Sequence, residues 1–461
     1  MLTEKDAKKR YVIIAALILA VAAITFVAAF FLGGGSFFGS GAAGGVIELD
    51  GDSVRITGEG AYEEDGNVYV ISGGDYTVKG ELSDGSLIVD DEYETSTIRL
   101  HLSGARIHCD KDAAIRVNNA KDVVIDLSEG TGNFLSGGEE YSKNAEDDGT
   151  GGVIFSHDDL EIGGLGSLEI TAKYKHGIEC NDRLVISGGK ITISAPRDGI
   201  NANDGVDVSG GELFITAEDD GISAGKAFLM TAGKIGIDNC YEGIEALTVD
   251  IRDGDIDIYC TDDGINANGQ EAAGPDAKDG EETWIRVSGG NINVRNDTGM
   301  DCDGFDSNGD IDISGGNIRI SLSGSGTNCA LDWGSERGGV CTVSGGTVIA
   351  CGGSPMVEAF DEASTQCGIL YINNDGTDDG DIVAVKDDSN DTVLEWEVPT
   401  GFTAVQMSSP DLKIGRSYTI VFGKSKETVM IEEVSSQFGE KPQGFGKGPG
   451  PGFKKGPVNS P

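Results

Sequence analysis

Between Lys175 and Gly346 the chain repeats one short pattern of apolar and polar residues. A His, Asp or Glu followed by Gly and Ile recurs in steps of 22, 22, 22 and 21 residues, with its glycines at Gly177, Gly199, Gly221, Gly243 and Gly264. The segments between them alternate apolar and polar residues, as in Lys190–Ser194 and Asp255–Tyr259. Such alternation is typical of strands with one buried face, and the short fixed period predicts a stack of repeated β-coils.

A coil of about 22 residues, made of short strands and tight corners, predicts a parallel β-helix. A leucine-rich repeat shares the period, but its repeated leucines and its helix-forming half are missing from this sequence. A second glycine series, out of phase with the first, begins at Ser187–Gly189 and Ser209–Gly211. We expect glycine at the corners because it adopts positive φ without a Cβ clash.

Stacked coils place equivalent residues about 4.8 Å apart, so the repeat can be read as columns. One column is apolar and predicts the core: Ile178, Ile200, Ile222, Ile244 and Ile265. The column two residues later admits only small side chains: Cys180, Ala202, Ala224, Ala246 and Ala267. With nine cysteines, an odd number, and no CxxC pair, the pattern favours buried free thiols over disulfides or zinc.

A third column is mostly acidic and contains His176, Asp198, Asp220, Glu242 and Asp263. The residues directly before it are Lys175, Arg197, Asp219, Tyr241 and Asp262. Like charges stacked at this spacing repel each other. Either the acids face water and cap turns, or they hold a hard cation such as Ca²⁺, which prefers carboxylate oxygens.

We expect calcium for the column as a whole. A further carboxylate group lies at Asp301, Asp303 and Asp306, although Gly304 and Phe305 break the EF-hand pattern. The predicted metal ligands are Asp198, Asp219, Asp220, Glu242, Asp262, Asp263, Asp301, Asp303 and Asp306.

The charge balance narrows the class of partner. Lys and Arg number 34 against 78 Asp and Glu, which gives a net charge of −44. This balance argues against nucleic acid or an anionic surface as a direct partner.

The start of the chain predicts a membrane anchor. A basic flank, residues 1–10, precedes the uncharged stretch Tyr11–Leu32, which is long enough to span a bilayer as a helix. The basic flank would stay in the cytoplasm, and a Gly/Ser/Ala linker, residues 33–45, would lead to an extracellular part. A cleaved signal peptide is the alternative, although its apolar stretch is usually shorter.

The remainder divides into three predicted parts. The parallel β-helix occupies residues 46–367, and strands in residues 368–433 form a β cap over its open end. Residues 434–461 are rich in Gly, Pro and Lys and are predicted to be disordered.

Several phrases together resemble a known family. They are SDGSLIVD (83–90), FSHDDLEI (155–162), YKHGI (174–178), DDGINA (262–267), DGFDSNG (303–309), ALDW (330–333) and VSGGTVIA (343–350). From residue 46 to about 433 the chain resembles the bacterial cell-surface carbohydrate-binding parallel β-helix proteins, which are related in fold to calcium-dependent pectate lyases. The resemblance implies a right-handed parallel β-helix, bound calcium, and affinity for plant cell-wall glycans such as cellulose or polygalacturonate.

Three functions remain open at this point. The first is a membrane-anchored, calcium-dependent polysaccharide-binding protein, with candidate glycan contacts at Tyr174, Lys175, His176, Arg197 and Tyr241. The second is a calcium-dependent polysaccharide lyase, in which Lys175 or Arg197 would act as the base. The third is a structural spacer or adhesin without affinity for sugars. We favour the binding protein over the enzyme.

Overall fold

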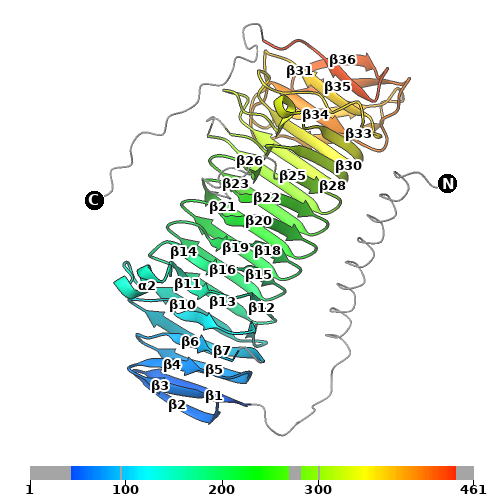
Figure 1. Cartoon of the computed structure of the whole chain (residues 1–461). Helices are drawn as coiled ribbons and strands as arrows, with labels where there is room; N and C mark the ends of the chain where they lie inside the picture. The colour runs from blue at the N-terminus through cyan, green and yellow to red at the C-terminus, as the bar shows by residue number, and fades with distance from the viewer. Residues whose placement is uncertain (1–42, 94–95, 269–281, 299–301, 443–461) are drawn as a thin grey trace, which may run out of the picture. The chain divides into compact units, whose positions relative to one another are not determined.

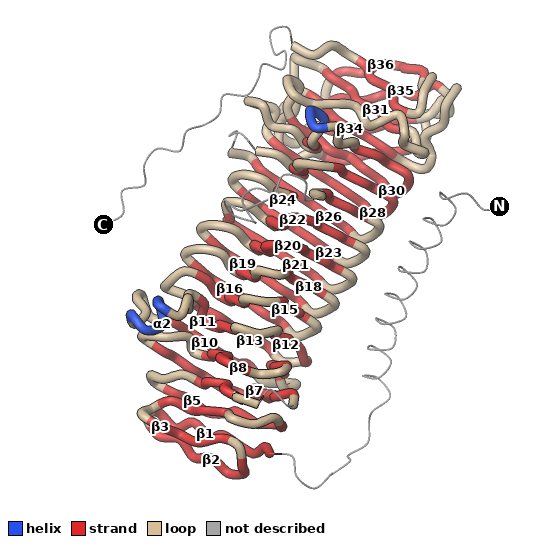
Figure 2. The backbone as a smooth tube through the Cα atoms, in the orientation of Figure 1, coloured by secondary structure: helices blue, strands red, loops and turns tan. Residues whose placement is uncertain are grey.

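The computed structural model of the chain describes residues 43–93, 96–268, 282–298 and 302–442. These residues are almost entirely β-structure, in one 33-stranded sheet and one four-stranded sheet (Figures 1 and 2). The helices of the described part are short: α2, Lys143–Asp147, and a 3-10 turn, Ser335–Arg337. Ser142 caps α2 by accepting a hydrogen bond from the backbone N–H of Ala145.

Each coil contributes strands to three series, and within a series neighbouring strands pair in parallel. The ladder series carries the acidic column at its start. It contains β4 (Asn67–Val70), β6 (Leu87–Asp90), β8 (Ile115–Asn119), β11 (Gly152–Ser156), β14 (His176–Cys180), β17 (Ile200–Ala202), the first parts of β20 (Ile222–Met230) and β22 (Ile244–Ile251), β24 (Ile265–Ala267), β27 (Phe305–Ser307) and β29 (Leu331–Trp333).

The other two series complete the coils. The second contains β9 (Asp122–Leu127), β12 (Leu160–Gly164), β15 (Arg183–Ile186), β18 (Gly205–Val208), the last parts of β20 and β22, and β25 (Trp284–Val287). The third contains β10 (Gly132–Gly137), β13 (Ser167–Thr171), β16 (Lys190–Ala195), β19 (Glu212–Ala217), β21 (Lys234–Cys240), β23 (Asp255–Cys260) and β26 (Asn291–Asn296).

Long strands join these series into one continuous hydrogen-bonded sheet. They are β1 (Ala43–Gly51), β5 (Gly74–Leu82), β7 (Thr97–Cys109), β28 (Asp310–Leu322) and β30 (Cys341–Gly352). In β28, for example, Ile311 pairs with Cys341 in the second series, whereas Ile318 pairs with Val348 in the third.

The predicted isoleucine column lies in the core, as expected. All five of its residues, from Ile178 to Ile265, are fully buried, and so is the column of small residues from Cys180 to Ala267. Each column stacks in register, because Ile200 pairs with Ile222 and Ala202 with Ala224. All nine cysteines are buried and unbonded, so in this chain the thiols behave as small apolar side chains.

Glycine is required in the two series for different physical reasons. Glycines that end the Gly-Gly pairs have positive φ, such as Gly211 at 80°. Glycines that follow the acids are required by close packing instead. A Cβ on Gly221 would lie 2.6 Å from the carbonyl oxygen of Gly243 and 2.6 Å from Ile237. Positive φ therefore explains only the second series.

The predicted fold class, as stated, is wrong in two respects. The coils are not uniform, since the hydrogen-bonded ladder positions lie 22 residues apart at Asp198–Asp220, 40 apart at Asp263–Asp303 and 26 apart at Asp303–Cys329. Corner-spanning strands also merge the faces into one 33-stranded sheet, closed by a separate antiparallel sheet.

The predicted transmembrane helix is likewise not supported. Among the residues that the structure describes, no helix is long and apolar enough to cross a membrane. The stretch Tyr11–Leu32 itself lies outside the described residues.

The boundaries of the predicted linker and tail also change. Strand β1 already begins at Ala43, and it pairs antiparallel with β2 (Ser53–Glu59), while β3 (Ala61–Glu64) pairs with β4. A side chain on Gly45 would clash with the Thr57 carbonyl oxygen. Glycine at this position therefore allows β1 and β2 to pair closely and does not indicate a flexible linker.

The C-terminal region contains two groups of strands. Strands β31 (Gly368–Ile372), β34 (Ala404–Ser408) and β37 (Ser435–Phe438) extend the large sheet beyond β30, and β33 (Thr392–Glu397), β32 (Ile382–Lys386), β35 (Ser417–Phe422) and β36 (Ser425–Met430) form the antiparallel sheet. Strand β37 falls within the stretch predicted to be disordered. It is ordered because it pairs with β31 and packs Phe438 against the core.

Replacing Ile222 by Ala should lower the free energy of unfolding by about 2–5 kcal/mol, because a fully buried side chain leaves a cavity between two identical neighbours. Ser194→Ala, on an exposed position of β16, should change it by less than about 0.5 kcal/mol. Urea unfolding followed by circular dichroism measures both. Equal effects of the two substitutions would contradict the burial of this column.

Candidate acid ladder

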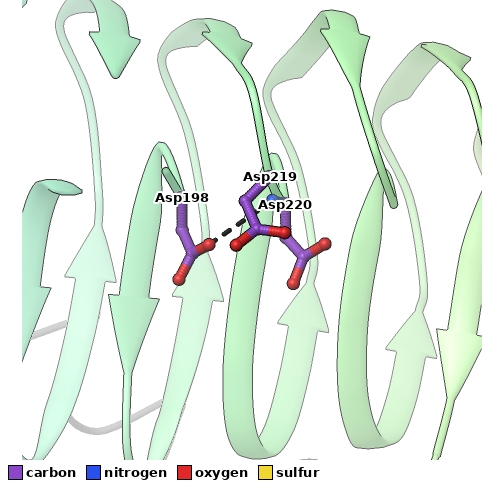
Figure 3. Close-up of side chains that lie close together, drawn as sticks. All are labelled: Asp198, Asp219 and Asp220. Carbon is purple, nitrogen blue, oxygen red and sulfur yellow. Dashed lines mark hydrogen bonds between the residues drawn. The ribbon is translucent and has the colours of Figure 1, made fainter. Parts of the chain in front are cut away.

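The acidic column lies on the turns that lead into the ladder series, and backbone hydrogen bonds fix its spacing. The N–H of Gly199 donates to the carbonyl oxygen of Asp220, and the N–H of Gly221 donates to that of Glu242, each at 2.9 Å. Carboxylates add a second connection. The backbone N–H of Asp220 donates to Asp198 Oδ1 at 3.4 Å (Figure 3), and that of Glu242 donates to Asp220 Oδ1 at 3.3 Å. Each acid is thus positioned by the next coil.

The same arrangement continues across the irregular coils. The backbone N–H of Asp303 donates to Asp263 Oδ1 at 2.7 Å, and that of Cys329 donates to Asp303 Oδ1 at 2.6 Å. We call the column Asp198, Asp220, Glu242, Asp263 and Asp303 the acid ladder. Its register survives even though 40 residues separate Asp263 from Asp303.

In the described part of the chain, the ladder acids and their neighbours form four groups in which one carboxylate oxygen of each residue lies within 4.8 Å of those of the others. We number them in chain order: the first cluster is Asp198, Asp219 and Asp220; the second is Asp220, Glu242 and Glu245; the third is Glu242, Asp262 and Asp263; the fourth is Asp303, Asp306 and Asp332. Asp220 and Glu242 each belong to two clusters. In Figure 3 the three carboxylates of the first cluster project to the same side of the ribbon.

Eight of the nine predicted metal ligands lie in these clusters, and Asp301 lies outside the described residues. Sequence reasoning missed Glu245 and Asp332. Both lie three residues after the acid position, in a column where Asn266 pairs with Asp306 and Asp306 with Asp332. Because that column mixes Asn and Ser with acids, its sequence does not indicate a set of carboxylate ligands.

Asp198 stays ionised at one end of the ladder. Burial opposes its charge, but contact with His176, together with hydrogen bonds from Asn201 Nδ2 and the Asp220 N–H, holds its pKa below the usual range. His176 Nδ1 lies 3.1 Å from Asp198 Oδ2 without a well-directed hydrogen bond.

Asp220 and Glu242 have no such cation beside them among the residues that the structure describes. Burial, followed by the charges of Asp198, Glu245 and Asp219, raises the pKa of Asp220 to about 8. Burial and then the charge of Asp220 raise the pKa of Glu242 to about 10. These carboxyls therefore carry protons at neutral pH unless a cation replaces them.

The fourth cluster lies in a pocket of about 410 Å³. Asp262, Asp263 and Met356 line it together with the acids of the cluster. Burial, then the charge of Asp332, raises the pKa of Asp306 to about 7, and burial followed by the charge of Asp263 raises that of Asp303. Several closely spaced carboxyl groups therefore face the same pocket.

One buried amide beside the third cluster supports a cation there. Asn266 Nδ2 donates to both carboxylate oxygens of Glu242 at 3.2 Å, and this fixes the orientation of the amide. Its Oδ1 is buried and has no hydrogen-bond partner within the described part of the chain. An unsatisfied buried oxygen is costly, and an amide oxygen beside carboxylates is a normal Ca²⁺ ligand.

The predicted glycan contacts lie beside the first and third clusters, with one exception. The column next to the ladder contains Lys175, Arg197, Asp219 and Tyr241. The Arg197 N–H donates to the Lys175 carbonyl oxygen, and the Tyr241 N–H donates to the Asp219 carbonyl oxygen. Arg197 Nη1 lies 3.8 Å from Asp219 Oδ2. The hydrogen bond between the Tyr241 hydroxyl and Asp262 is the main cause of the raised pKa of Tyr241. Tyr174 instead turns toward α2, where its hydroxyl contacts Glu146 at 3.1 Å.

Comparison with known sequences gives a consistent result over much of the chain. The sequence model of the family described as "Carbohydrate-binding domain-containing protein" matches residues 64–246 and 228–388. A protein of Acetivibrio thermocellus with the same description is 33% identical over 151 residues. This alignment covers 32% of the present chain and 52% of the relative, so it spans about half of that protein's length.

Among solved structures, a polysaccharide lyase-like protein from C. thermocellum, studied as a gadolinium derivative, is similar at 24% sequence identity and a TM-score of 0.43. The superposition covers 65% of this chain and 97% of the other. At this level of similarity no property is transferred from that structure.

The raised pKa values predict that the calcium-free protein loses stability as pH rises. The folded state holds protons on Asp220 and Glu242 up to a pH of about 8 and 10, whereas the ordinary pKa values of these side chains are 3.8 and 4.5. The unfolded chain binds fewer protons between these limits, so stability falls with increasing pH. Asp198, with its lowered pKa, acts in the opposite direction only at more acidic pH.

In chelator, the melting temperature should therefore fall between pH 5 and pH 8, and Asp220→Asn should flatten this dependence because the amide does not titrate. Differential scanning calorimetry across the pH series measures both proteins. A wild-type melting temperature that rises over this range would contradict the predicted protonation of the ladder.

Proposed function

Because this chain belongs to the family of carbohydrate-binding domain-containing proteins, we propose that it binds an acidic polysaccharide through calcium held by the acid ladder. The observation that carries the proposal is the stacking of four carboxylate clusters, one of them bordering a buried amide oxygen that has no partner among the described residues. Family membership supports a sugar ligand, and the carboxylates support the cation.

The residues of the third and fourth clusters fit calcium best. Glu242, Asp262 and Asp263 supply carboxylate oxygens, and Asn266 adds a neutral oxygen oriented by its bond to Glu242. Asp303, Asp306 and Asp332 supply the next set. Oxygen-only donor sets of this kind suit a hard cation that tolerates irregular geometry.

The ladder needs a cation to attract a sugar acid, since its own charge is repulsive. The chain carries a net charge of −44, and a polyuronate is also negatively charged. Bound calcium supplies positive charge and free coordination positions for sugar carboxylate and hydroxyl oxygens. The pocket of about 410 Å³ beside the fourth cluster leaves room for such a group.

The arrangement favours binding over cleavage. The two candidate bases for a lyase, Lys175 and Arg197, do not line this pocket. The Lys175 ammonium lies 5.1 Å from the ring centre of Tyr174, and Arg197 contacts Asp219. General-base catalysis requires a base within hydrogen-bond reach of the proton that it removes.

Calcium should stabilise the fold. At free calcium 100-fold above the dissociation constant, one site adds about 2.7 kcal/mol to the free energy of unfolding. Glu242→Gln, which alters two clusters, should reduce calcium affinity measured by isothermal titration calorimetry, whereas Glu129→Gln, on an exposed turn, should not. Identical melting curves in calcium and in chelator, with no binding heat, would refute the cation sites.

Polygalacturonate should bind in calcium and remain intact. Asp220→Asn and Asp263→Asn should weaken this calcium-dependent binding, because each removes a ligand charge. Affinity electrophoresis measures retention, and ultraviolet absorbance detects the unsaturated product of a lyase. Product formation that disappears in Lys175→Ala or Arg197→Ala would favour the lyase. Absence of binding to any glycan would favour a structural role.

A further inference from the structure

We propose that a pocket at the junction of the last coils and the C-terminal strands binds one uncharged sugar residue of a glycan, without calcium. The pocket has a volume of about 310 Å³ and is lined by residues outside the acid ladder. We call it the junction pocket. The inference goes beyond the proposed function, because it assigns other residues, another class of sugar and a contact that needs no cation.

Three loops that are far apart in the sequence form the walls of the junction pocket. They are residues 323–325, which follow β28, residues 376–379, between β31 and β32, and residues 400–403, between β33 and β34. The N–H of Gly324 donates to the carbonyl oxygen of Gly401 at 2.7 Å. The N–H of Phe402 donates to Thr377 Oγ1 at 2.9 Å. A Cβ on Gly324 would lie 2.8 Å from the Phe402 Cα, so glycine allows this contact. The walls are joined before a ligand arrives, and this lowers the entropic cost of binding.

At the end of β26, Asp297 presents a carboxylate that is held in one orientation. The Tyr259 hydroxyl donates to its Oδ1 at 2.7 Å, and Arg295 Nη2 donates to its Oδ2 at 2.7 Å. The side chain of Asp297 remains 38% exposed, and each carboxylate oxygen can accept a further hydrogen bond. Asp297 is therefore a preoriented acceptor for the hydroxyl groups of a sugar.

The C-terminal strands bring a second carboxylate to the pocket, that of Asp379. Its Oδ1 accepts the N–H of Gly401 at 2.8 Å, which anchors the side chain to the pocket wall. Ser323 and Ser325 add hydroxyl groups whose oxygens lie 2.9 Å apart. Serine hydroxyls donate as well as accept, so the pocket complements a sugar residue, whose own hydroxyl groups do both.

The charges of the junction pocket favour an uncharged ligand. The charged side chains among its described lining residues, Asp297 and Asp379, are both acidic. The neighbouring Arg295 already pairs with Asp297. Lys424, the next cation, pairs with Asp378. A sugar acid would therefore be repelled, whereas a neutral hydroxyl group donates to a carboxylate in a bond about twice as strong as one between neutral groups.

Size and family membership support a single sugar residue. A volume of about 310 Å³ lies at the lower end of the range of small-ligand sites, about 300–1,000 Å³. The second stretch that the carbohydrate-binding family model matches, residues 228–388, includes Asp297, Ser323 and Asp379. Asp297 and Asp379 belong to none of the four carboxylate clusters, so binding here is expected to be independent of calcium.

The test uses isothermal titration calorimetry in chelator with three neutral oligosaccharides, cellopentaose, xylopentaose and mannopentaose, and with trigalacturonate. At least one neutral probe should bind, and trigalacturonate should not. Asp297→Asn and Asp379→Asn should each weaken the binding of that probe about tenfold, because each weakens a charge-assisted hydrogen bond. Asp378→Asn is the matched control and should leave the affinity unchanged, because this side chain pairs with Lys424 and does not line the pocket.

Hydrogen exchange measured by mass spectrometry gives a second readout on the wild-type protein, which does not depend on the folding of any variant. The bound probe should slow exchange in residues 323–325 and 400–403 and leave β2 and β3 unchanged. The assignment would be overturned if no neutral probe binds, if binding requires calcium, if trigalacturonate binds more tightly, or if Asp379→Asn binds as well as wild type. Polygalacturonate binding in calcium is measured separately, so the proposed function stands or fails by its own result.

Discussion

The parallel pairing of successive coils brings the same residue position of each coil to within about 4.8 Å of its neighbours, and the other properties of the molecule follow from this spacing. For Ile200 and Ile222 the repetition is favourable, because identical apolar side chains fill a continuous core. For Asp220 and Glu242 it is unfavourable, because two carboxylates are held together in a buried setting. The same register thus creates both the stability of the coil and the chemistry of its surface.

The ladder carboxylates also belong to the hydrogen bonding of the fold. Asp198, Asp220 and Asp263 each accept a backbone N–H from the following coil. A carboxylate used in this way cannot be removed without leaving a backbone donor unsatisfied. Binding and folding therefore share the same oxygens, and this explains why the acids remain stacked despite their mutual repulsion.

The regular part of the fold could be predicted from the sequence, because a period of 22 residues places columns directly above one another. The isoleucine column and six acids, Asp198, Asp219, Asp220, Glu242, Asp262 and Asp263, follow from that period, whereas Asp303 and Asp306 stand out in the sequence only as a local group of carboxylates. The pairing of Asp306 with Asp332 could not be predicted, since coils of unequal length intervene. Glu245 was missed because Asn, Ser and Glu alternate in its column. The role of the glycines after the acids depends on packing against Ile237 and its equivalents, which no local pattern reveals.

The extra residues between Asp263 and Asp303 leave the hydrogen bond between these two positions at 2.7 Å. Strand register in this stack is therefore set by contacts between coils and not by the length of chain that joins them. Related chains could lengthen or shorten a corner during evolution and still keep every ladder position aligned. Segments carrying new contacts can accumulate at the corners, while the spacing of the sites beside them is inherited unchanged.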